Sequence, residues 1–225
     1  MLSTSPLLHF AENALQLIAL FFMAIAYTLK LRWIFRFPAS ADRQPPANPA
    51  VTNGALGARQ SLLAVAMPWT MASTRQHPLL YVQFVIFHLA VAASIAMSFA
   101  IPYAPQRIAD AGVIMALQLL FLGGAAVGIV RLIRRIADSY LRAISSPDDY
   151  FSLIMLIVWL LSSTWAAPNH PSGGEAGLTV YFLLTAFFLV YVPFSKISHY
   201  LYYPLARWYL DRTLGHRGFY PLNGA

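Results

Sequence analysis

Histidine is the residue type in this sequence with the clearest capacity for redox chemistry. The 225 residues include six histidines and no cysteine, which excludes disulfides, iron–sulfur clusters, thiolate zinc sites and cysteine nucleophiles. The carboxylates fall in loops between apolar stretches. The sequence also contains no nucleotide-binding loop, zinc-protease helix or serine nucleophile elbow. A redox cofactor in this chain must therefore be held by other ligands, and histidine is the first choice.

The histidines must be positioned by membrane helices. Hydrophobic residues make up 59% of the chain and charged residues 10%, whereas about a quarter of a soluble domain is charged. Crossing about 30 Å of hydrocarbon takes about 20 apolar residues in a helix. Windows of this kind lie near 13–35, 79–101, 111–130, 150–167 and 178–195. The predicted fold is an all-α membrane protein, a bundle of five transmembrane helices forming one membrane domain over 1–225.

Basic residues predict which way the spans run. Fourteen of the 15 Lys and Arg residues fall on one side of the five predicted spans, and Arg107 alone falls on the other. Because basic loops stay in the cytoplasm, the N-terminus is predicted outside and the C-terminus in the cytoplasm. The first 13 residues hold no Lys or Arg, which argues against a cleaved signal peptide. The net charge of +7 is explained without nucleic acid.

Two predicted segments lie on the cytoplasmic side. Residues 36–78 form a connector that is rich in Pro, Ala and Asn up to Arg59. Its stretch from Gln60 to Ser73 is apolar but too short to span and is broken by Pro68, so it is predicted to lie at the interface with Trp69 at headgroup depth. Residues 196–225 form a basic tail.

Three histidines fall within or at the ends of the spans. On the predicted topology His77 lies at the cytoplasmic mouth of the second span and His199 at the cytoplasmic end of the fifth, so the two share a depth. Two neutral imidazoles on different helices at one depth suit a b-type haem with two histidine ligands. His88 follows His77 by 11 residues, about three helical turns and about 16 Å, and so lies on nearly the same face.

Each histidine also has an ordinary interpretation. His77 would be an interfacial residue, His88 a hydrogen-bonded core residue and His199 a basic tail residue. The matched depth and the scarcity of other intramembrane titratable groups favour haem ligation. Gly123, Gly124 and Gly128 would admit a porphyrin or a neighbouring helix, and helix packing is the favoured interpretation of these small residues.

Residues 192–199, VPFSKISH, carry the most specific likeness to a known family. They resemble the proline-phenylalanine-serine-basic element and haem-ligating histidine of the respiratory nitrate reductase gamma subunit family, which includes membrane cytochrome b subunits of sulfite-reductase-linked complexes. The helix carrying His77 and His88, and the loop from Ser145 to Tyr150, are also similar. The likeness covers most of the chain from Met67 onward.

The resemblance implies two b haems stacked across the membrane. His77 and His199 would hold the haem near the cytoplasm, and His88 would be one ligand of an outer haem. The second outer ligand is expected 18 residues before His199, where this chain has Tyr181. Met115, in the third span, would be the substitute for this second outer ligand. The sequence therefore predicts the inner haem and leaves the outer haem open.

The resemblance also implies a function. Arg107 would bind quinone near the outer face; its ordinary interpretation is a loop arginine paired with Asp110. The chain would be an electron-transfer subunit, not a complete enzyme, between the quinone pool and cytoplasmic iron–sulfur and catalytic subunits, in the cytoplasmic membrane of a bacterium or archaeon. The terminal substrate and direction of electron flow stay open. The alternatives are a haem-free membrane anchor and, disfavoured by the lack of inverted repeats, a small transporter.

Overall fold

The described part of the chain is entirely helical. The structure is a computed structural model that describes residues 5–37, 59, 62–63, 67, 69, 72–169 and 175–214, without the side chains of 72–73 and 211–214. These residues contain no strand. The predicted connector over 38–58, Pro68, His170, His216 and the tail from 215 lie outside the described residues. The helices are α1 (Pro6–His9), a π-helical turn (Phe10–Leu15), α2 (Gln16–Ile34), α4 (Ala72–Gln76), α5 (Pro78–Tyr103), a 3-10 turn (Pro105–Ile108), α6 (Ala111–Ala137), α7 (Ser139–Ala143), α8 (Pro147–Ala166), α9 (Ala176–Tyr191), two 3-10 turns (Val192–Phe194 and Lys196–Ser198) and α10 (His199–Leu214).

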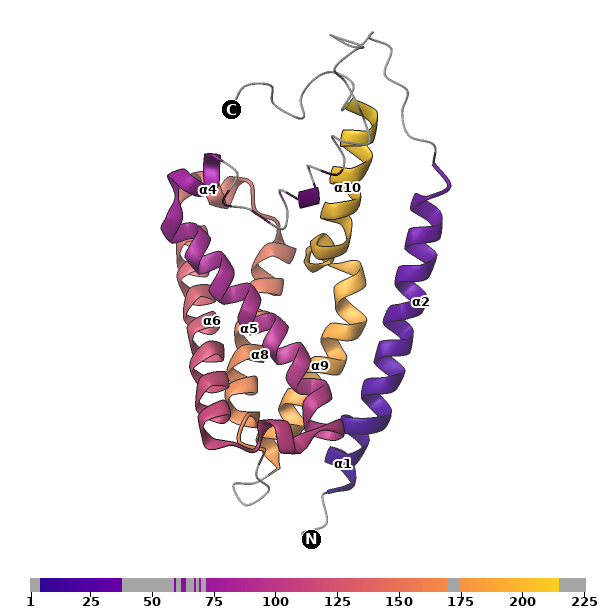
Figure 1. The fold of residues 1–225 in the computed structure, drawn as a ribbon, viewed down its shortest axis with the longest axis vertical. Helices are drawn as coiled ribbons and strands as arrows, with labels where there is room; N and C mark the ends of the chain where they lie inside the picture. Colours follow the sequence, from indigo (N-terminus) through magenta and orange to yellow (C-terminus); the bar gives the residue numbers. More distant parts are fainter. Residues whose placement is uncertain are drawn as a thin grey trace. The chain divides into compact units, whose positions relative to one another are not determined.

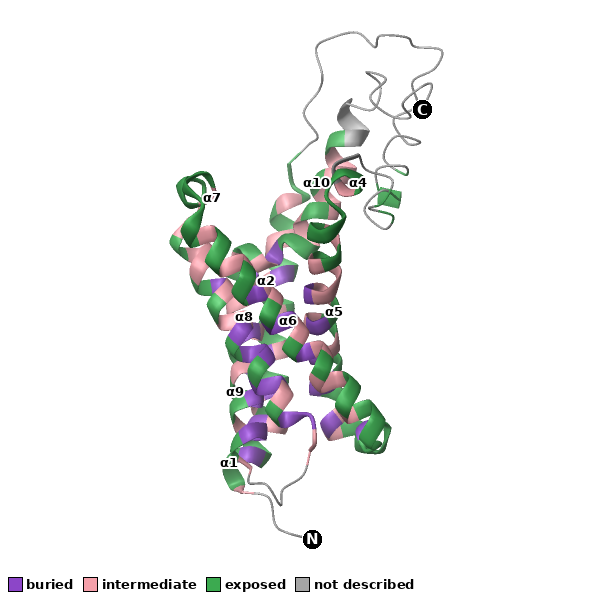
Figure 2. Cartoon of the chain, turned by 90° about the vertical axis from the view of Figure 1, so that its left-hand side faces the viewer, coloured by how far each residue is buried: buried purple, intermediate pink, exposed green. Residues whose placement is uncertain are grey.

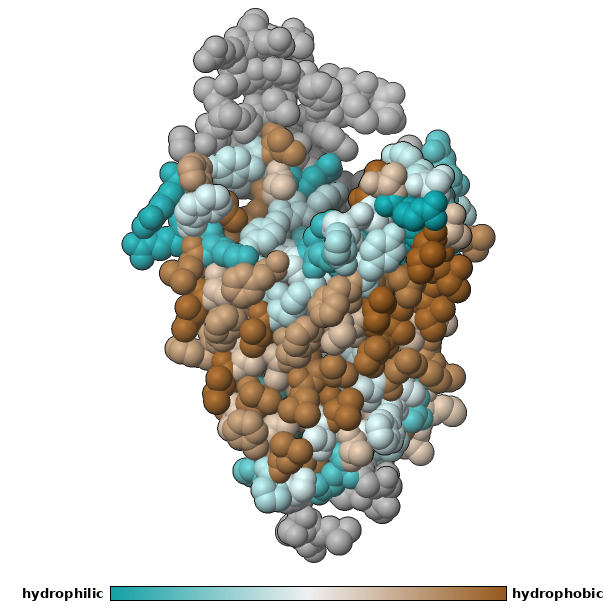
Figure 3. Space-filling model, turned by 180° about the vertical axis from the view of Figure 1, so that it is seen from behind, coloured by the Kyte–Doolittle hydropathy of each residue, from teal (hydrophilic) through white to brown (hydrophobic). Residues whose placement is uncertain are grey.

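Five of these helical stretches are long and apolar enough to cross a membrane, as predicted. They are Pro6–Ile34, Pro78–Tyr103, Ala111–Ala137, Pro147–Ala166 and Ala176–Phe194. On the face drawn in Figure 3, hydrophobic side chains gather over the middle of the helices and hydrophilic ones toward their ends. Many large apolar side chains point outward, among them Phe21 and Leu119, because the surrounding lipid is as apolar as the helix core. The chain is a multi-pass membrane protein.

Helix ends differ from the predicted windows where capping and charge decide them. α8 begins three residues early, at Pro147, because Ser146 and Asp149 form a reciprocal capping box that satisfies the first backbone N–H groups. α6 continues past Val130 to Ala137. The positive charges of arginines in the last helical turn interact favourably with the helix dipole, so these arginines do not end the helix.

The chain divides into two compact units. The helical unit comprises Met1–Tyr27 and Leu79–Lys196, and the basic unit comprises Thr28–Pro78 and Ile197–Ala225. The helical unit has six basic and six acidic residues, so its formal charge is zero. The basic unit has nine basic and two acidic residues. The whole net charge of +7 therefore belongs to the basic unit.

Glycines bring α5 and α8 against α6 in the helical unit, where α5 runs obliquely across its neighbours (Figure 1). A Cβ added at Gly124 would lie 2.5 Å from the Cβ of Ala90 in α5, and one at Gly128 would lie 2.7 Å from Cγ1 of Ile157 in α8. Figure 2 shows buried positions along these facing helices. The small residues serve helix packing, and no space for a porphyrin is left at these two glycines.

The start of the first span is fixed to α9. The backbone N–H of Ser5 donates to both carboxylate oxygens of Glu175, each at 2.9 Å. Further along, the rings of Phe22 and Phe194 meet at 6.1 Å between centroids. Leu8 and Ala11, near the beginning of the first span, are buried. The first span is therefore part of the bundle through α9.

Candidate functional site

His77 and His199 belong to the same unit. His77 lies between α4 and α5, and His199 is the first residue of α10; both side chains are exposed. Both fall in the basic unit, whereas His88 falls in the helical unit. A group held by His77 and His199 would need lipid or another protein to complete its cover.

The donor set of His77 and His199 suits a haem better than a bare metal ion. A structural or catalytic zinc takes three or four protein ligands, and no group of three His, Asp or Glu side chains with that potential occurs among the described residues. A porphyrin supplies its own equatorial nitrogens and asks the protein for axial ligands only. By donor type, the two imidazoles therefore suit a haem.

His88 is half-buried on α5 and is oriented by its own helix. Its Nδ1 lies 2.7 Å from the carbonyl oxygen of Phe84, and because a carbonyl only accepts, Nδ1 is the protonated nitrogen. The imidazole also packs on the Phe84 ring at 4.0 Å between centroids. A hydrogen bond at one ring nitrogen is how a metal-ligating histidine is commonly oriented, so Nε2 is the nitrogen that could ligate.

Position 181, where the second outer ligand is expected, is occupied by a wholly buried tyrosine within a closed set of hydrogen bonds, the polar ring. The Tyr181 hydroxyl donates to the Ser94 carbonyl at 2.5 Å, and the hydroxyls of Ser94 and Ser163 are 2.7 Å apart. The Ser163 hydroxyl donates to the Trp159 carbonyl at 2.8 Å, the Trp159 indole donates to Thr185 Oγ1 at 2.9 Å, and Thr185 donates to the Tyr181 carbonyl at 2.7 Å. The polar ring joins α5, α8 and α9.

An outer haem does not fit between His88 and Tyr181. Because the Tyr181 hydroxyl donates to a carbonyl, it keeps its proton and cannot act as a phenolate ligand. Its partner Ser94 lies six residues beyond His88 on α5, about 9 Å along the helix axis. The Tyr181 hydroxyl therefore contacts α5 at a different level from His88. The stacked Trp159 and Tyr181 rings, 6.4 Å between centroids, fill the space between α8 and α9.

Arg107 and Met115 stand apart from His88. Arg107 lies in the 3-10 turn after α5 and is exposed. Asp110, its predicted partner, caps α6 by accepting from the backbone N–H groups of Gly112 and Val113. Met115 is exposed on the outside of α6, which is a poor position for a ligand within the bundle.

A polar cluster around Asp149, which we call the end cluster, joins the end of α6, the start of α8 and the segment after α9. Sequence reasoning did not identify it as a site. Asp149 Oδ2 accepts from the Ser146 backbone N–H at 2.7 Å and from the Lys196 ammonium at 2.6 Å. Arg135 Nη1 lies 3.9 Å from the same oxygen. The cluster therefore connects α6, α8 and the segment after α9. The one sequence signal was the Ser-x-x-Asp spacing of a capping box.

Asp148 extends this end cluster. It accepts hydrogen bonds from the Tyr191 hydroxyl and, at 3.1 Å, from the Lys196 backbone N–H. The hydroxyls of Ser152 and Tyr191 are 2.8 Å apart. The two neighbouring aspartates thus hold the end of α9 against the start of α8, immediately before His199 in the chain.

We expect Asp149→Ala to destabilise the protein by about 2 kcal/mol, because it removes a cap and a salt bridge together. Asp110→Ala is the matched control, since the Asp110 carboxylate accepts from the backbone N–H groups of Gly112 and Val113 in the first turn of α6; we expect a loss of about 1 kcal/mol there. Thermal unfolding in detergent measures both. Equal losses would show that the link from Asp149 to Lys196 contributes nothing.

Comparison with known proteins finds a distant relative. No family model matches the chain, and no solved structure matches it. A protein of Nitratidesulfovibrio vulgaris strain Hildenborough is 26% identical over 172 residues, which cover 71% of this chain and 72% of that protein. Its description names no activity. The chain is therefore similar to a bacterial protein without a stated activity, and its function is inferred from its own residues.

Proposed function

We propose that this chain is the membrane subunit of a redox complex, holding one b-type haem through His77 and His199 and exchanging electrons between membrane quinone and a cytoplasmic iron–sulfur partner. The observation that carries the proposal is that both imidazoles belong to the one unit that also carries the net charge of +7. The likeness of residues 192–199 to the nitrate reductase gamma family supports the same role.

In this proposal the chain's own residues would hold the haem and orient its ligands. A bound haem supplies a one-electron redox centre. His77 and His199 would each present a neutral imidazole nitrogen, one ahead of α5 and one at the start of α10. Lys196, three residues before His199 in the chain, is bound by Asp148 and Asp149.

The soluble partner is expected to dock by charge. The basic unit holds nine Lys and Arg residues against two aspartates, and this excess of positive charge would attract an acidic protein and speed its association at low salt. Because basic loops stay in the cytoplasm, the proposal places this partner in the cytoplasm.

Quinone exchange is better placed near His77 than at Arg107. α5 has 26 residues, about 39 Å at 1.5 Å per residue, and it separates Arg107 from His77 along the chain. With no room for an outer haem beside Tyr181, electrons from a quinol at Arg107 would have no intermediate carrier. The proposal therefore places quinone exchange toward the cytoplasmic end of the spans.

Haem content tests the proposal. We expect the protein purified from membranes to contain one b-type haem per polypeptide, measured by a reduced-minus-oxidised absorbance spectrum against protein concentration. The bound haem should be reducible by a quinol analogue. Purified chain without haem would reject the cytochrome function.

A haem-free membrane anchor is the second candidate, and the polar ring favours it. Position 181, where a second outer ligand is expected, holds a buried tyrosine bonded to Ser94, and His77 and His199 are exposed. Copurification of a redox partner with a haem-free chain would establish the anchor. Copurification together with one haem would establish the electron-transfer subunit.

A further inference from the structure

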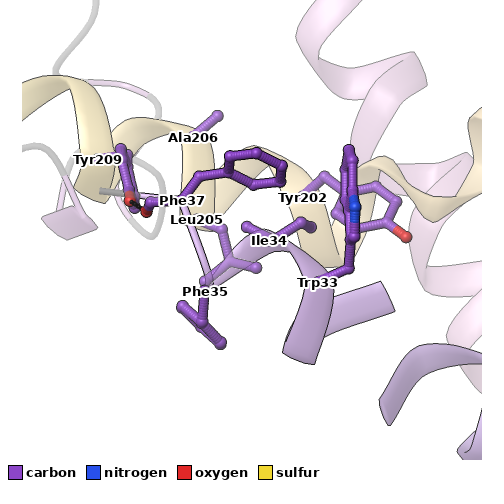
Figure 4. A pocket seen from close by; sticks show the side chains of 8 residues that line it. All are labelled: Trp33, Ile34, Phe35, Phe37, Tyr202, Leu205, Ala206 and Tyr209. Carbon is purple, nitrogen blue, oxygen red and sulfur yellow. Dashed lines mark hydrogen bonds between the residues drawn. The ribbon is translucent and has the colours of Figure 1, made fainter. Parts of the chain in front are cut away.

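A cavity of about 410 Å³ lies within the basic unit, between the end of α2 and one face of α10. Its lining residues are Trp33, Ile34, Phe35, Phe37, Tyr202, Leu205, Ala206 and Tyr209. In Figure 4 the side chains of Ile34 and Phe37 lie between Tyr209 on one side and Trp33 with Tyr202 on the other. The volume lies in the range of small-ligand sites.

The lining suits a hydrocarbon chain. Residues 202, 205, 206 and 209 recur at helical spacing and give α10 one aromatic and aliphatic face. The Tyr209 hydroxyl donates to the Phe37 carbonyl at 2.5 Å, so its polar end is already bonded to backbone. The rings of Trp33 and Phe37 meet edge to face at 4.9 Å. A quinone headgroup would need hydrogen-bond donors aimed into the cavity, and the lining is hydrocarbon instead.

Cations stand beside this apolar lining. Arg36 lies between the lining residues Phe35 and Phe37 in sequence and is exposed. Arg207 follows the lining residue Ala206; its Nε is buried and has no hydrogen-bond partner. A buried donor without an acceptor is costly, and an anionic oxygen beside it would remove that cost.

The position of the cavity identifies the source of its occupant. The span Pro6–Ile34 ends at the cavity, and Trp33 there is the kind of residue that lies at headgroup depth. Basic pockets at the ends of transmembrane helices bind anionic lipid headgroups. We propose that the cavity between α2 and α10 holds an acyl chain of an anionic membrane phospholipid, whose phosphate pairs with Arg36 and Arg207.

The test is a lipid titration of the delipidated full-length protein in detergent. Phosphatidylglycerol and phosphatidylcholine with the same acyl chains are added separately, and bound lipid is counted by native mass spectrometry. Phosphatidylglycerol should bind more tightly. Arg36→Gln and Arg207→Gln should each weaken it about fivefold, and Ala206→Trp should remove binding by filling the cavity. Arg142→Gln is the matched control, an exposed arginine of the helical unit, and should leave affinity unchanged.

Each contrary result overturns a defined part of the proposal. Equal affinity for the two lipids, or an equal loss in Arg142→Gln, rejects the phosphate contact. Unchanged phosphatidylglycerol binding in Ala206→Trp rejects the cavity as the site, provided circular dichroism shows the variant folded. A short-chain quinone that binds and is blocked by Ala206→Trp, while phosphatidylglycerol does not bind, reassigns the cavity to quinone. Haem content, measured in the same samples, reports separately on the proposed function.

Discussion

The His199→Ala variant is expected to lose its b-type haem. His199 supplies one of the two proposed axial ligands, and no second histidine lies within ten residues on either side of it in the sequence. Loss of a residue that only supports a metal ligand already costs about 10- to 100-fold in affinity, so loss of the ligand itself should leave little haem after purification. The reduced-minus-oxidised spectrum per polypeptide measures the effect.

Other histidine variants make this result specific. His77→Ala should behave like His199→Ala, whereas His88→Ala should retain the haem, because His88 belongs to the other unit and is not one of the two proposed ligands. His9→Ala is the matched control, an exposed histidine near the N-terminus. His199→Met should retain haem with a raised reduction potential, since methionine is a weaker donor that raises the potential of b- and c-type centres. Full haem in His199→Ala would contradict the ligand assignment.

The Tyr181→Ala variant is expected to lose about 3–5 kcal/mol of stability, the cost of deleting a large buried aromatic side chain. Tyr181 is fully buried, stacks on Trp159 and reaches α5 through its hydroxyl. Deleting its ring leaves a cavity between three helices and opens the polar ring. Thermal unfolding in detergent, followed by loss of helical circular dichroism, measures the change.

Tyr181→Phe separates the hydroxyl from the ring. It keeps the packing and removes one buried hydrogen bond, so we expect a loss of about 1 kcal/mol, the usual range for interhelical hydrogen bonds in membranes. Tyr103→Phe is the control, because Tyr103 is 62% exposed. If Tyr181→Phe were as stable as the wild type, the hydrogen bond to Ser94 would have no role in joining α5 to α9.

The sequence predicted the positions of the spans and the packing role of two glycines, but it did not predict where each helix begins and ends. Apolar windows located all five spans, because hydrocarbon length fixes how many apolar residues a helix needs. Their ends moved where other forces decide them, as at Ser146 and Asp149, whose capping box starts α8 before Tyr150. The glycines at 124 and 128 were predicted to serve packing, and the short Cβ distances there confirm it.

The sequence by itself determined a five-span, all-α membrane protein and the small set of histidines available for redox chemistry, because span length and residue type are local properties of the chain. Its predicted orientation, haem ligands and partner stay predictions. Only the tertiary structure decided that Tyr181 meets Ser94, 87 residues away, that Asp149 meets Lys196, and that the whole net charge falls in one unit. These pairings depend on where helices cross, and a crossing is set by side-chain packing between segments far apart in the sequence.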